Sequence, residues 1–382
     1  MKALLKTVLK FIHIKRLNEA ARKLRVFYYF IFDLIGYIFF SPLLVISKFR
    51  KYEKEKIKKI LIIRLDRIGD MVLSTPAIRA VRETFPGRKI HLLVSEYTKD
   101  LMADSPDIDK LLVYKKDKTG KDYDLAVALH PGFTQNYIAF ISGSKFRAGY
   151  TGWGGGFFLT HRLKDNRAVR IKHEAESALE IAGAVGCETN NKKLEISVTE
   201  KGEKYADAFF KKNNLEKGKK IIAVHPGARQ EYIRWKKEGF AEVSDRLIKE
   251  ENAKIILIGG ESEKNLLKEI TLLMNEKPLV VVDLELSELV SLIKRCSLFI
   301  GNSTGTMHIA SVFIPVVAIF GSQHPLDSYK KWGPWGEGHI IISKNLDCKD
   351  CHPSDCNTFN CMEMISVEEV YNAALKQLGV RI

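Results

Sequence analysis

Small polar residues, two glycines and one histidine separate two apolar runs at residues 301–310. This segment, GNSTGTMHIA, follows CSLFI and precedes SVFIPVVAIFG. Gly301 and Gly305 allow another molecule to approach the backbone closely, and a hydroxyl from Ser303 or Thr304 can cap a helix. The free amides at a helix start form an anion site, within reach of His308 one turn later. The pattern predicts either such a site or an ordinary capped turn with a buried histidine.

A second glycine turn, HPGARQEYIRW at residues 225–235, favours the anion site. Pro226 and Gly227 shape this turn, and Arg229 and Arg234 supply positive charge. Helix-start amides together with arginine suit a diphosphate. The G-x-G-x-x-G dinucleotide fingerprint follows none of the predicted strands, which argues against a nicotinamide enzyme.

A carboxylate follows the first glycine turn of the chain, in RLDRIGDMVLSTPA. Asp70 comes directly after Gly69, and Asp66 lies nearer the end of the preceding apolar run. Asp70 can simply cap a helix. If it faces a diphosphate across a cleft, it can instead accept a proton from a hydroxyl.

Continuous apolar runs that alternate with helical patterns must position these residues. The runs ILIIRL, KIHLLV, KLLVY and YDLAVAL form one set, and KIIAVHPG, AKIILIGG, LVVVDL, SLFIGN and PVVAIFG form a second set. Such runs indicate parallel strands covered on both faces, with ligands at their carboxyl ends. The first helix is expected over residues 77–85, with Pro76 in its first turn, and residues 192–203 are expected to be a polar connection.

The N-terminal 59 residues carry most of the net charge. Fifteen Lys or Arg against four Asp or Glu give +11 there, out of +15 for the 382-residue chain. Residues 26–46 are mostly apolar and have the length of a membrane span. Asp33, Pro42 and basic flanks on both sides instead favour a segment that lies on an anionic membrane surface. The alternative is a hydrophobic helix packed on the protein's own core.

Three blocks of the chain resemble glycosyltransferase family 9, the ADP-heptose:lipopolysaccharide heptosyltransferases and their relatives. The blocks are KILIIRLDRIGDMVLSTPAIRAVRETFP, HPGARQEYIRWKKEGFAEVSDRL and GNSTGTMHIASVFIPVVAIFG, and the resemblance covers about residues 60–375. It implies a GT-B fold, in which two Rossmann-like domains face a cleft, and an inverting reaction with a nucleotide-diphosphate sugar. Asp70 matches the proposed catalytic base. The residues that the resemblance implies for donor binding are Gly227, Ala228, Arg234, Ser303, Thr304, Gly305, Thr306 and His308.

One position departs from the family. Ser303 stands where the heptosyltransferases usually have an aspartate that is thought to face the donor sugar. The resemblance therefore implies the fold and the diphosphate site, but it leaves open heptose or a related sugar.

Four cysteines form a C-x2-C-x4-C-x4-C pattern near the C-terminus. Cys348, Cys351, Cys356 and Cys361 lie beside His352 at a spacing that suits a compact structural zinc site. Disulfides and reduced thiols are the alternatives. The transfer reaction itself is expected to require no cofactor.

The sequence thus predicts a membrane-associating extension (1–59), an acceptor domain (60–198) and a donor domain with a cysteine-rich tail (199–382). The predicted function is transfer of a sugar from ADP-heptose or a similar donor to a lipopolysaccharide core or another lipid-linked saccharide. The expected location is the cytoplasmic face of the bacterial inner membrane, and no nucleic acid is expected as a partner. A nucleotide-sugar epimerase and a non-catalytic membrane-anchored binder are the alternatives.

Overall fold

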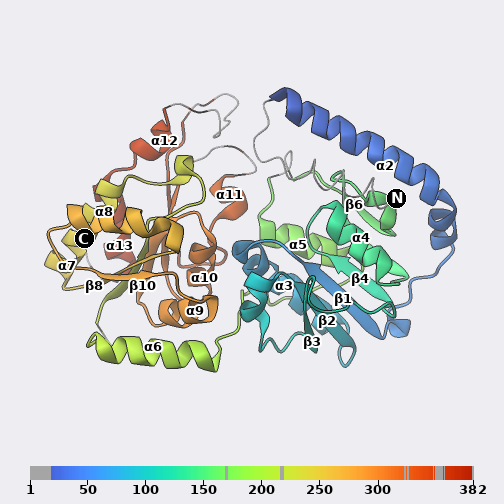
Figure 1. Ribbon diagram of the computed structural model, residues 1–382, viewed down its shortest axis with the longest axis horizontal. Coiled ribbons are helices and arrows are strands. Elements are labelled where there is room, and N and C mark those ends of the chain that lie inside the picture. Colours follow the sequence, from blue (N-terminus) through green and yellow to red (C-terminus); the bar gives the residue numbers. More distant parts are fainter. Residues whose placement is uncertain are drawn as a thin grey trace.

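The computed structural model contains two α/β domains, each built on one six-stranded sheet (Figure 1). It describes residues 19–167, 171–215, 219–321, 324, 327–346, 348, 356 and 358–380. The strand pairs within each sheet are all parallel. The predicted GT-B architecture is therefore confirmed.

The N-terminal sheet has the strand order β3-β2-β1-β4-β5-β6. Its strands are β1 (Lys59–Arg64), β2 (Lys89–Val94), β3 (Lys110–Val113), β4 (Leu125–Ala128), β5 (Phe146–Thr151) and β6 (His161–Lys164). The helices of this domain are α3 (Ile68–Thr84), α4 (Phe133–Ile141) and α5 (Glu174–Gly183), with short 3-10 turns η1 (Lys54–Lys56), η2 (Glu96–Met102) and η3 (Gly156–Phe158). Strand β1 is central and almost fully buried, which explains its uninterrupted apolar run.

The C-terminal sheet has the strand order β12-β11-β10-β7-β8-β9. Its strands are β7 (Ile221–His225), β8 (Lys254–Gly259), β9 (Leu279–Val282), β10 (Leu298–Asn302), β11 (Val316–Phe320) and β12 (Ile340–Ser343). The helices are α6 (Glu200–Lys212), α7 (Lys237–Glu251), α8 (Lys264–Leu273), α9 (Leu286–Lys294), α10 (Gly305–Phe313), α11 (Tyr329–Trp332), α12 (Asn360–Glu363) and α13 (Val367–Gln377), with 3-10 turns η4 (Glu231–Ile233) and η5 (Glu261–Glu263). Strands β7 and β10 are neighbours, so the two glycine turns that follow them lie at the same edge of the sheet.

The first helix begins earlier than the sequence predicts. Helix α3 starts at Ile68 and continues through Pro76, so the expected start near residue 77 is wrong. A proline inside a helix cannot donate a hydrogen bond to the carbonyl four residues earlier. The hydroxyl of Thr75 donates to the Val72 oxygen at 2.9 Å and satisfies that carbonyl instead.

The expected polar connection at residues 192–203 is also shorter than predicted, because α6 begins at Glu200. The Thr199 side chain accepts a hydrogen bond from the Gly202 amide and caps the helix. A Cβ at Gly202 would lie 2.2 Å from the Ser287 carbonyl oxygen, so glycine allows α6 to pack closely against α9. This glycine obscured the helical pattern, because it lowers the helix propensity of the sequence.

The two domains meet where the N-termini of α3 and α10 face each other. A Cβ at Gly69 would lie 2.6 Å from the His308 ring, and one at Gly305 would lie 2.9 Å from Ile68. Both glycines are therefore required for close interdomain packing. The His173 Nε2 atom, 3.0 Å from the Gly333 carbonyl oxygen, adds a polar contact between the domains.

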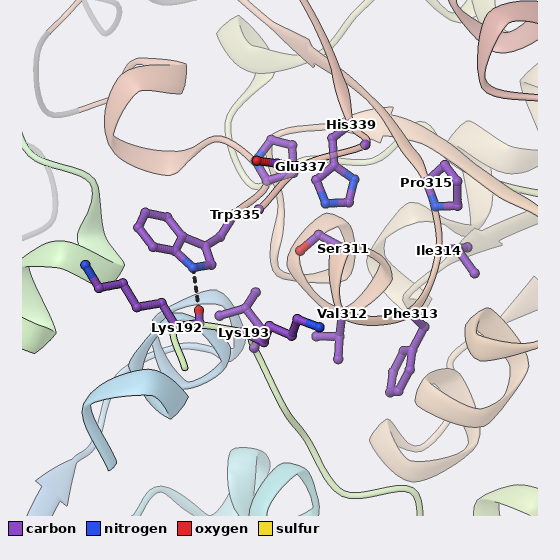
Figure 2. A pocket seen from close by; sticks show the side chains of 14 residues that line it. Lys192, Lys193, Ser311, Val312, Phe313, Ile314, Pro315, Trp335, Glu337 and His339 are labelled. Carbon is purple, nitrogen blue, oxygen red and sulfur yellow. Dashed lines mark hydrogen bonds between the residues drawn. The ribbon is translucent and has the colours of Figure 1, made fainter. Parts of the chain in front are cut away.

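A cavity of about 870 Å³ lies between the domains at the C-terminal end of α10. The connecting segment supplies Lys192 and Lys193, and Trp335 lies on the facing loop (Figure 2). The Trp335 indole donates to the Lys192 backbone oxygen at 2.7 Å. None of the residues predicted to bind or react with substrate lines this cavity.

Helix α2 (Glu19–Lys48) lies along the outside of the N-terminal domain (Figure 1). Its inner face contributes Phe32, Tyr37 and Phe40 to an aromatic cluster with Phe133, Phe157 and Phe158. The Asp33 carboxylate accepts a hydrogen bond from the Gly155 amide at 2.8 Å, and burial raises the pKa of Asp33. Asp33 therefore anchors the helix on the domain.

The outer face of α2 is apolar and exposed. It includes Phe30, Leu34, Ile35, Ile38, Phe39 and Val45, of which Ile38 is 66% and Phe39 81% exposed. Within the part of the chain described by the structure, no helix combines the length and apolar character that a membrane crossing requires. One side of the predicted apolar segment thus packs on the protein's own core, and the other side does not.

Gly36→Leu should detach α2 from the domain. A side chain at Gly36 would lie 2.1 Å from the Phe157 ring, which is held among other aromatic residues. We expect limited proteolysis to cleave within residues 28–48 faster than in the unchanged protein. Ile35→Ala, on the exposed face one residue earlier, is the control and should leave the cleavage rate unchanged. If Gly36→Leu and the unchanged protein were cleaved at the same rate, the result would contradict the observed packing.

Candidate active site

A cavity of about 310 Å³ lies between the domains, at the carboxyl ends of both sheets. The N-terminal domain contributes Arg67, Ile68, Gly69, Asp70 and Tyr97 to its lining. The C-terminal domain contributes Arg229, Gln230, Tyr232, Ile233, Ser303, Thr304, Gly305, His308, Asp327 and Trp332. This is the place where a doubly wound fold binds its ligands.

The cavity brings together five of the residues proposed from the sequence: Asp70, Ser303, Thr304, Gly305 and His308. Gly227, Ala228, Arg234 and Thr306 are not among its lining residues. The Arg234 guanidinium instead donates two hydrogen bonds to the Ala228 carbonyl, at 2.9 and 2.6 Å. Arg234 therefore holds the turn, whereas Arg229 on the same turn lines the cavity.

A buried asparagine joins the two glycine turns. The Asn302 side chain donates to the Pro226 oxygen at 2.8 Å and accepts from the Trp235 amide at 3.0 Å. Thr304 caps α10 by accepting a hydrogen bond from the Met307 amide at 3.4 Å. The open amides at the start of α10 are thereby held in place at the cavity. Asn302 lies within the GNSTGTMHIA segment but was not among the residues predicted from the sequence.

A carboxylate occupies the space next to Gly227. A Cβ at Gly227 would lie within 1.8 Å of a Glu263 oxygen, and His225 Nε2 lies 3.3 Å from the Glu263 carboxylate. A negative charge here repels a diphosphate. An anion is therefore favoured nearer Ser303–Gly305 than at Gly227.

His308 is neutral at physiological pH. Burial lowers the pKa of His308 to about 3, with a further contribution from His173. Its Nδ1 is buried and has no hydrogen-bond partner among the described residues. The imidazole can therefore donate or accept one hydrogen bond in the cavity, but it supplies no positive charge.

Asp70 caps α3, which is one of the two roles that the sequence left open. One carboxylate oxygen accepts from the Arg67 amide at 3.3 Å and caps α3, and the other accepts from the Arg64 guanidinium at 2.9 Å. Burial raises the pKa of Asp70, Asp66 and Glu174 raise it further, and Arg64 opposes them. A carboxylate of raised pKa at the edge of a cleft is suited to accept a proton.

Glu174, at the start of α5, extends this network into the other domain. It lies 3.2 Å from Arg64, 3.1 Å from Arg167 and 3.5 Å from Lys331 of α11. Burial alone would raise the pKa of Glu174, but these three cations together lower it. Sequence patterns could not identify the contacts with Arg64 and Lys331, because these two residues lie in segments far from Glu174.

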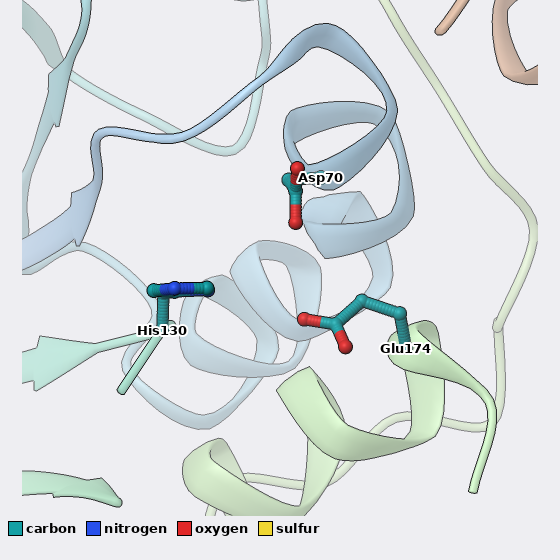
Figure 3. Close-up of side chains that lie close together, drawn as sticks. All are labelled: Asp70, His130 and Glu174. Carbon is teal, nitrogen blue, oxygen red and sulfur yellow. The ribbon is translucent and has the colours of Figure 1, made fainter. Parts of the chain in front are cut away.

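Asp70, His130 and Glu174 lie close together (Figure 3), with one potential ligand atom from each within 4.8 Å of the others. Both carboxylates already bind the Arg64 guanidinium. Burial lowers the pKa of His130 to about 4, so its ring is neutral. We interpret the cluster as an ion-pair network around Arg64 rather than as a metal site.

The predicted zinc site stays a prediction. Cys351 and His352 lie outside the described residues. The Cys356 thiol accepts a hydrogen bond from the Phe359 amide at 3.4 Å, and Cys361 lies near Gly321.

Comparisons with known proteins identify the family of the chain. Residues 114–361 match the model of glycosyltransferase family 9 (heptosyltransferase). Lipooligosaccharide heptosyltransferase 2 of Campylobacter jejuni is 27% identical over 324 residues, which cover 79% of this chain and 94% of the relative. The chain therefore belongs to glycosyltransferase family 9 and is a glycosyltransferase.

Solved structures show the same fold. A family 9 glycosyl transferase from Veillonella parvula has a TM-score of 0.73 and 24% identity, covering 84% of this chain and 97% of that one. E. coli heptosyltransferase WaaC with ADP has a TM-score of 0.62 and 13% identity, covering 84% and 99%. A second WaaC structure contains ADP-2-deoxy-2-fluoro heptose.

Glu174→Gln should destabilise the fold strongly. The substitution leaves Arg64, Arg167 and Lys331 without their shared buried carboxylate, which costs about 3–5 kcal/mol. Urea unfolding measures this loss. Glu176→Gln, two residues later on the exposed side of α5, keeps an oxygen that can accept from the His173 amide and should cost less than about 1 kcal/mol. An equal loss in the free energy of unfolding for the two substitutions would contradict the proposed importance of the ion-pair network.

Proposed function

We propose that the protein transfers heptose or a related sugar from a nucleotide-diphosphate donor to a lipid-linked saccharide, with inversion at the anomeric carbon. One observation carries the proposal. Asp70, held by the N-terminal domain, lines the same cavity as the open N-terminus of α10 from the C-terminal domain. A proton acceptor thus faces an anion site across a space of about 310 Å³.

The donor diphosphate binds at the start of α10. The amides of Ser303–Gly305, with the positive end of the helix dipole, favour negative charge. Ser303 adds a hydroxyl there rather than a second negative charge. Glu263 repels phosphate and accepts hydrogen bonds from hydroxyls, so the ribose of the nucleotide lies on its side of the site.

Asp70 accepts the proton of an acceptor hydroxyl as that oxygen attacks the anomeric carbon. The bond between the sugar and the distal phosphate breaks, and the nucleoside diphosphate leaves from the opposite face. Hydrogen-bond donors that are already in place stabilise the charge that develops on the leaving phosphate. His308, being neutral, can donate one such hydrogen bond.

Family membership and the relatives' names support ADP-heptose as the donor and a lipopolysaccharide core as the acceptor. The Campylobacter relative is named a lipooligosaccharide heptosyltransferase. WaaC, which shares the fold, has been solved with ADP and with an ADP-heptose analogue.

Helix α2 holds the enzyme on an anionic membrane surface at the cytoplasmic face of the inner membrane. Its outer apolar face is uncovered among the described residues, and the exposed cations Arg50, Lys51 and Lys54 follow the helix. Apolar burial together with basic residues is the usual basis of interfacial binding. A lipid-linked acceptor would lie on the same surface.

Asp70→Asn should abolish most transfer without weakening nucleotide binding. The amide preserves the shape of the side chain and can still cap α3, but it cannot accept the hydroxyl proton. We expect kcat to fall about 10²–10⁴-fold, with the Kd for ADP within about twofold of the unchanged enzyme. Asp66→Asn is the comparator, because Asp66 does not line the cavity. An equal loss of kcat in Asp66→Asn would remove the distinction on which the assignment of Asp70 rests.

Membrane binding should depend on the outer face of α2. Replacing Ile38 and Phe39 together by Asp should lower the fraction that sediments with anionic phospholipid vesicles, because two charges then oppose apolar burial. Leu272 and Leu273, an exposed apolar pair on α8, receive the same double change as the control. If both variants sediment equally, α2 is not the membrane-binding element. Transfer to a soluble acceptor fragment should persist in both.

A further inference from the structure

Two arginines from different domains line the same cavity, and neither forms an ion pair with a carboxylate of the described residues. Arg67 directly precedes α3, and Arg229 lies on the turn after β7. Both side chains are exposed, and among the described residues neither has a side-chain hydrogen bond or an ion pair within 4 Å. By contrast, Arg64, Arg79 and Arg295 each contact at least one carboxylate.

The two guanidinium groups interact unfavourably. The pKa of Arg229 is lowered, first by partial burial and then by the positive charge of Arg67, with Tyr232 and Asp327 acting in the opposite direction. Two cations that face each other across a cleft repel unless an anion lies between them. Each planar guanidinium can donate two parallel hydrogen bonds to a phosphate or carboxylate.

On the basis of the proposed function, we propose that Arg67 and Arg229 together bind one oxyanion of a substrate, one arginine from each domain. The group is a phosphate or a carboxylate. Two sources have this chemistry: the donor diphosphate, which the start of α10 places in the same cavity, and an acidic group on the acceptor saccharide.

Such a site has a mechanical consequence for the enzyme. Because each domain supplies one arginine, the anion is fully bound only when the domains are together. Arg67 also lies three residues before Asp70, so binding of the anion fixes the substrate next to the proton acceptor. Arg67 thereby adds a contact from the N-terminal domain to a ligand whose other contacts come from the C-terminal domain.

The test measures binding and kinetics in the full-length protein. Calorimetry with ADP and with inorganic pyrophosphate compares the unchanged enzyme, Arg67→Gln, Arg229→Gln and the double variant. If the diphosphate is the shared anion, each single variant binds both probes at least about tenfold more weakly. The double variant then loses less than the product of the single losses, because one interaction has already been broken.

If the acceptor supplies the anion, the Kd for ADP stays unchanged. The KM for the acceptor then rises at least about tenfold in both single variants, and removal of the acceptor's phosphates and carboxylates eliminates the difference. Arg67→Lys and Arg229→Lys should recover part of the loss in either case, because they restore charge without the planar geometry. Arg88→Gln, on the loop between α3 and β2, is the control.

Two results would overturn the shared site. One is a change of less than about twofold in every measured constant, and the other is losses that multiply fully in the double variant, which would mean independent sites. Thermal unfolding of each variant excludes a folding defect, since both side chains are exposed. If the unchanged protein transfers no sugar, the proposed function fails, whereas the pyrophosphate measurement still tests the arginine pair.

Discussion

The structure depends on one buried cation, the guanidinium of Arg64 at the end of β1. It is fully buried and bridges Asp70, at 2.9 Å, and Glu174, at 3.2 Å. An unpaired charge in this position would cost several kcal/mol, so the surrounding elements are constrained to supply its partners. Helix α3 supplies Asp70 and α5 supplies Glu174, which in turn contacts Lys331 of the other domain. The position of Asp70 and the contact between the domains are thus coupled through one ion-pair network.

This network explains how a carboxylate is retained in a cavity that we propose binds an anion. The N-termini of α3 and α10 face each other across the cavity, and both helix dipoles place positive charge there. Arg67 and Arg229 add two more cations. Asp70 is stabilised by the Arg67 amide at the start of α3 and by Arg64, which is buried and does not line the cavity. The Arg67 amide and Arg64 therefore compensate the negative charge of Asp70, so this charge does not prevent a diphosphate from binding in the cavity.

The sequence predicted what depends on local pattern, and it missed what depends on tertiary contact. Most strands of both parallel sheets, the loop at residues 301–310 and the position of Asp70 follow from apolar runs and glycine turns, whereas β5, β6 and β12 were not predicted. The start of α3 was predicted too late, because a hydroxyl from Thr75 compensates for Pro76. The sequence could not show that Arg229, rather than Arg234, lines the cavity, since both lie on one turn. Glu174, His130 and Lys331 converge only in the fold. Likewise, the inner face of α2 is defined by its contact with Phe157 and Gly155.

The central claim is that Asp70 accepts the proton within this buried network. The pH dependence of kcat/KM tests it most directly, in the pH range where circular dichroism shows the protein folded. Burial raises the pKa of Asp70, so its basic form is lost at a higher pH than for an ordinary carboxyl group of pKa about 4. The value of kcat/KM should therefore fall as the pH decreases through one ionisation above that value, and this ionisation should be absent from the residual activity of Asp70→Asn. A rate that is independent of pH, or the same acid limb in Asp70→Asn, would contradict it.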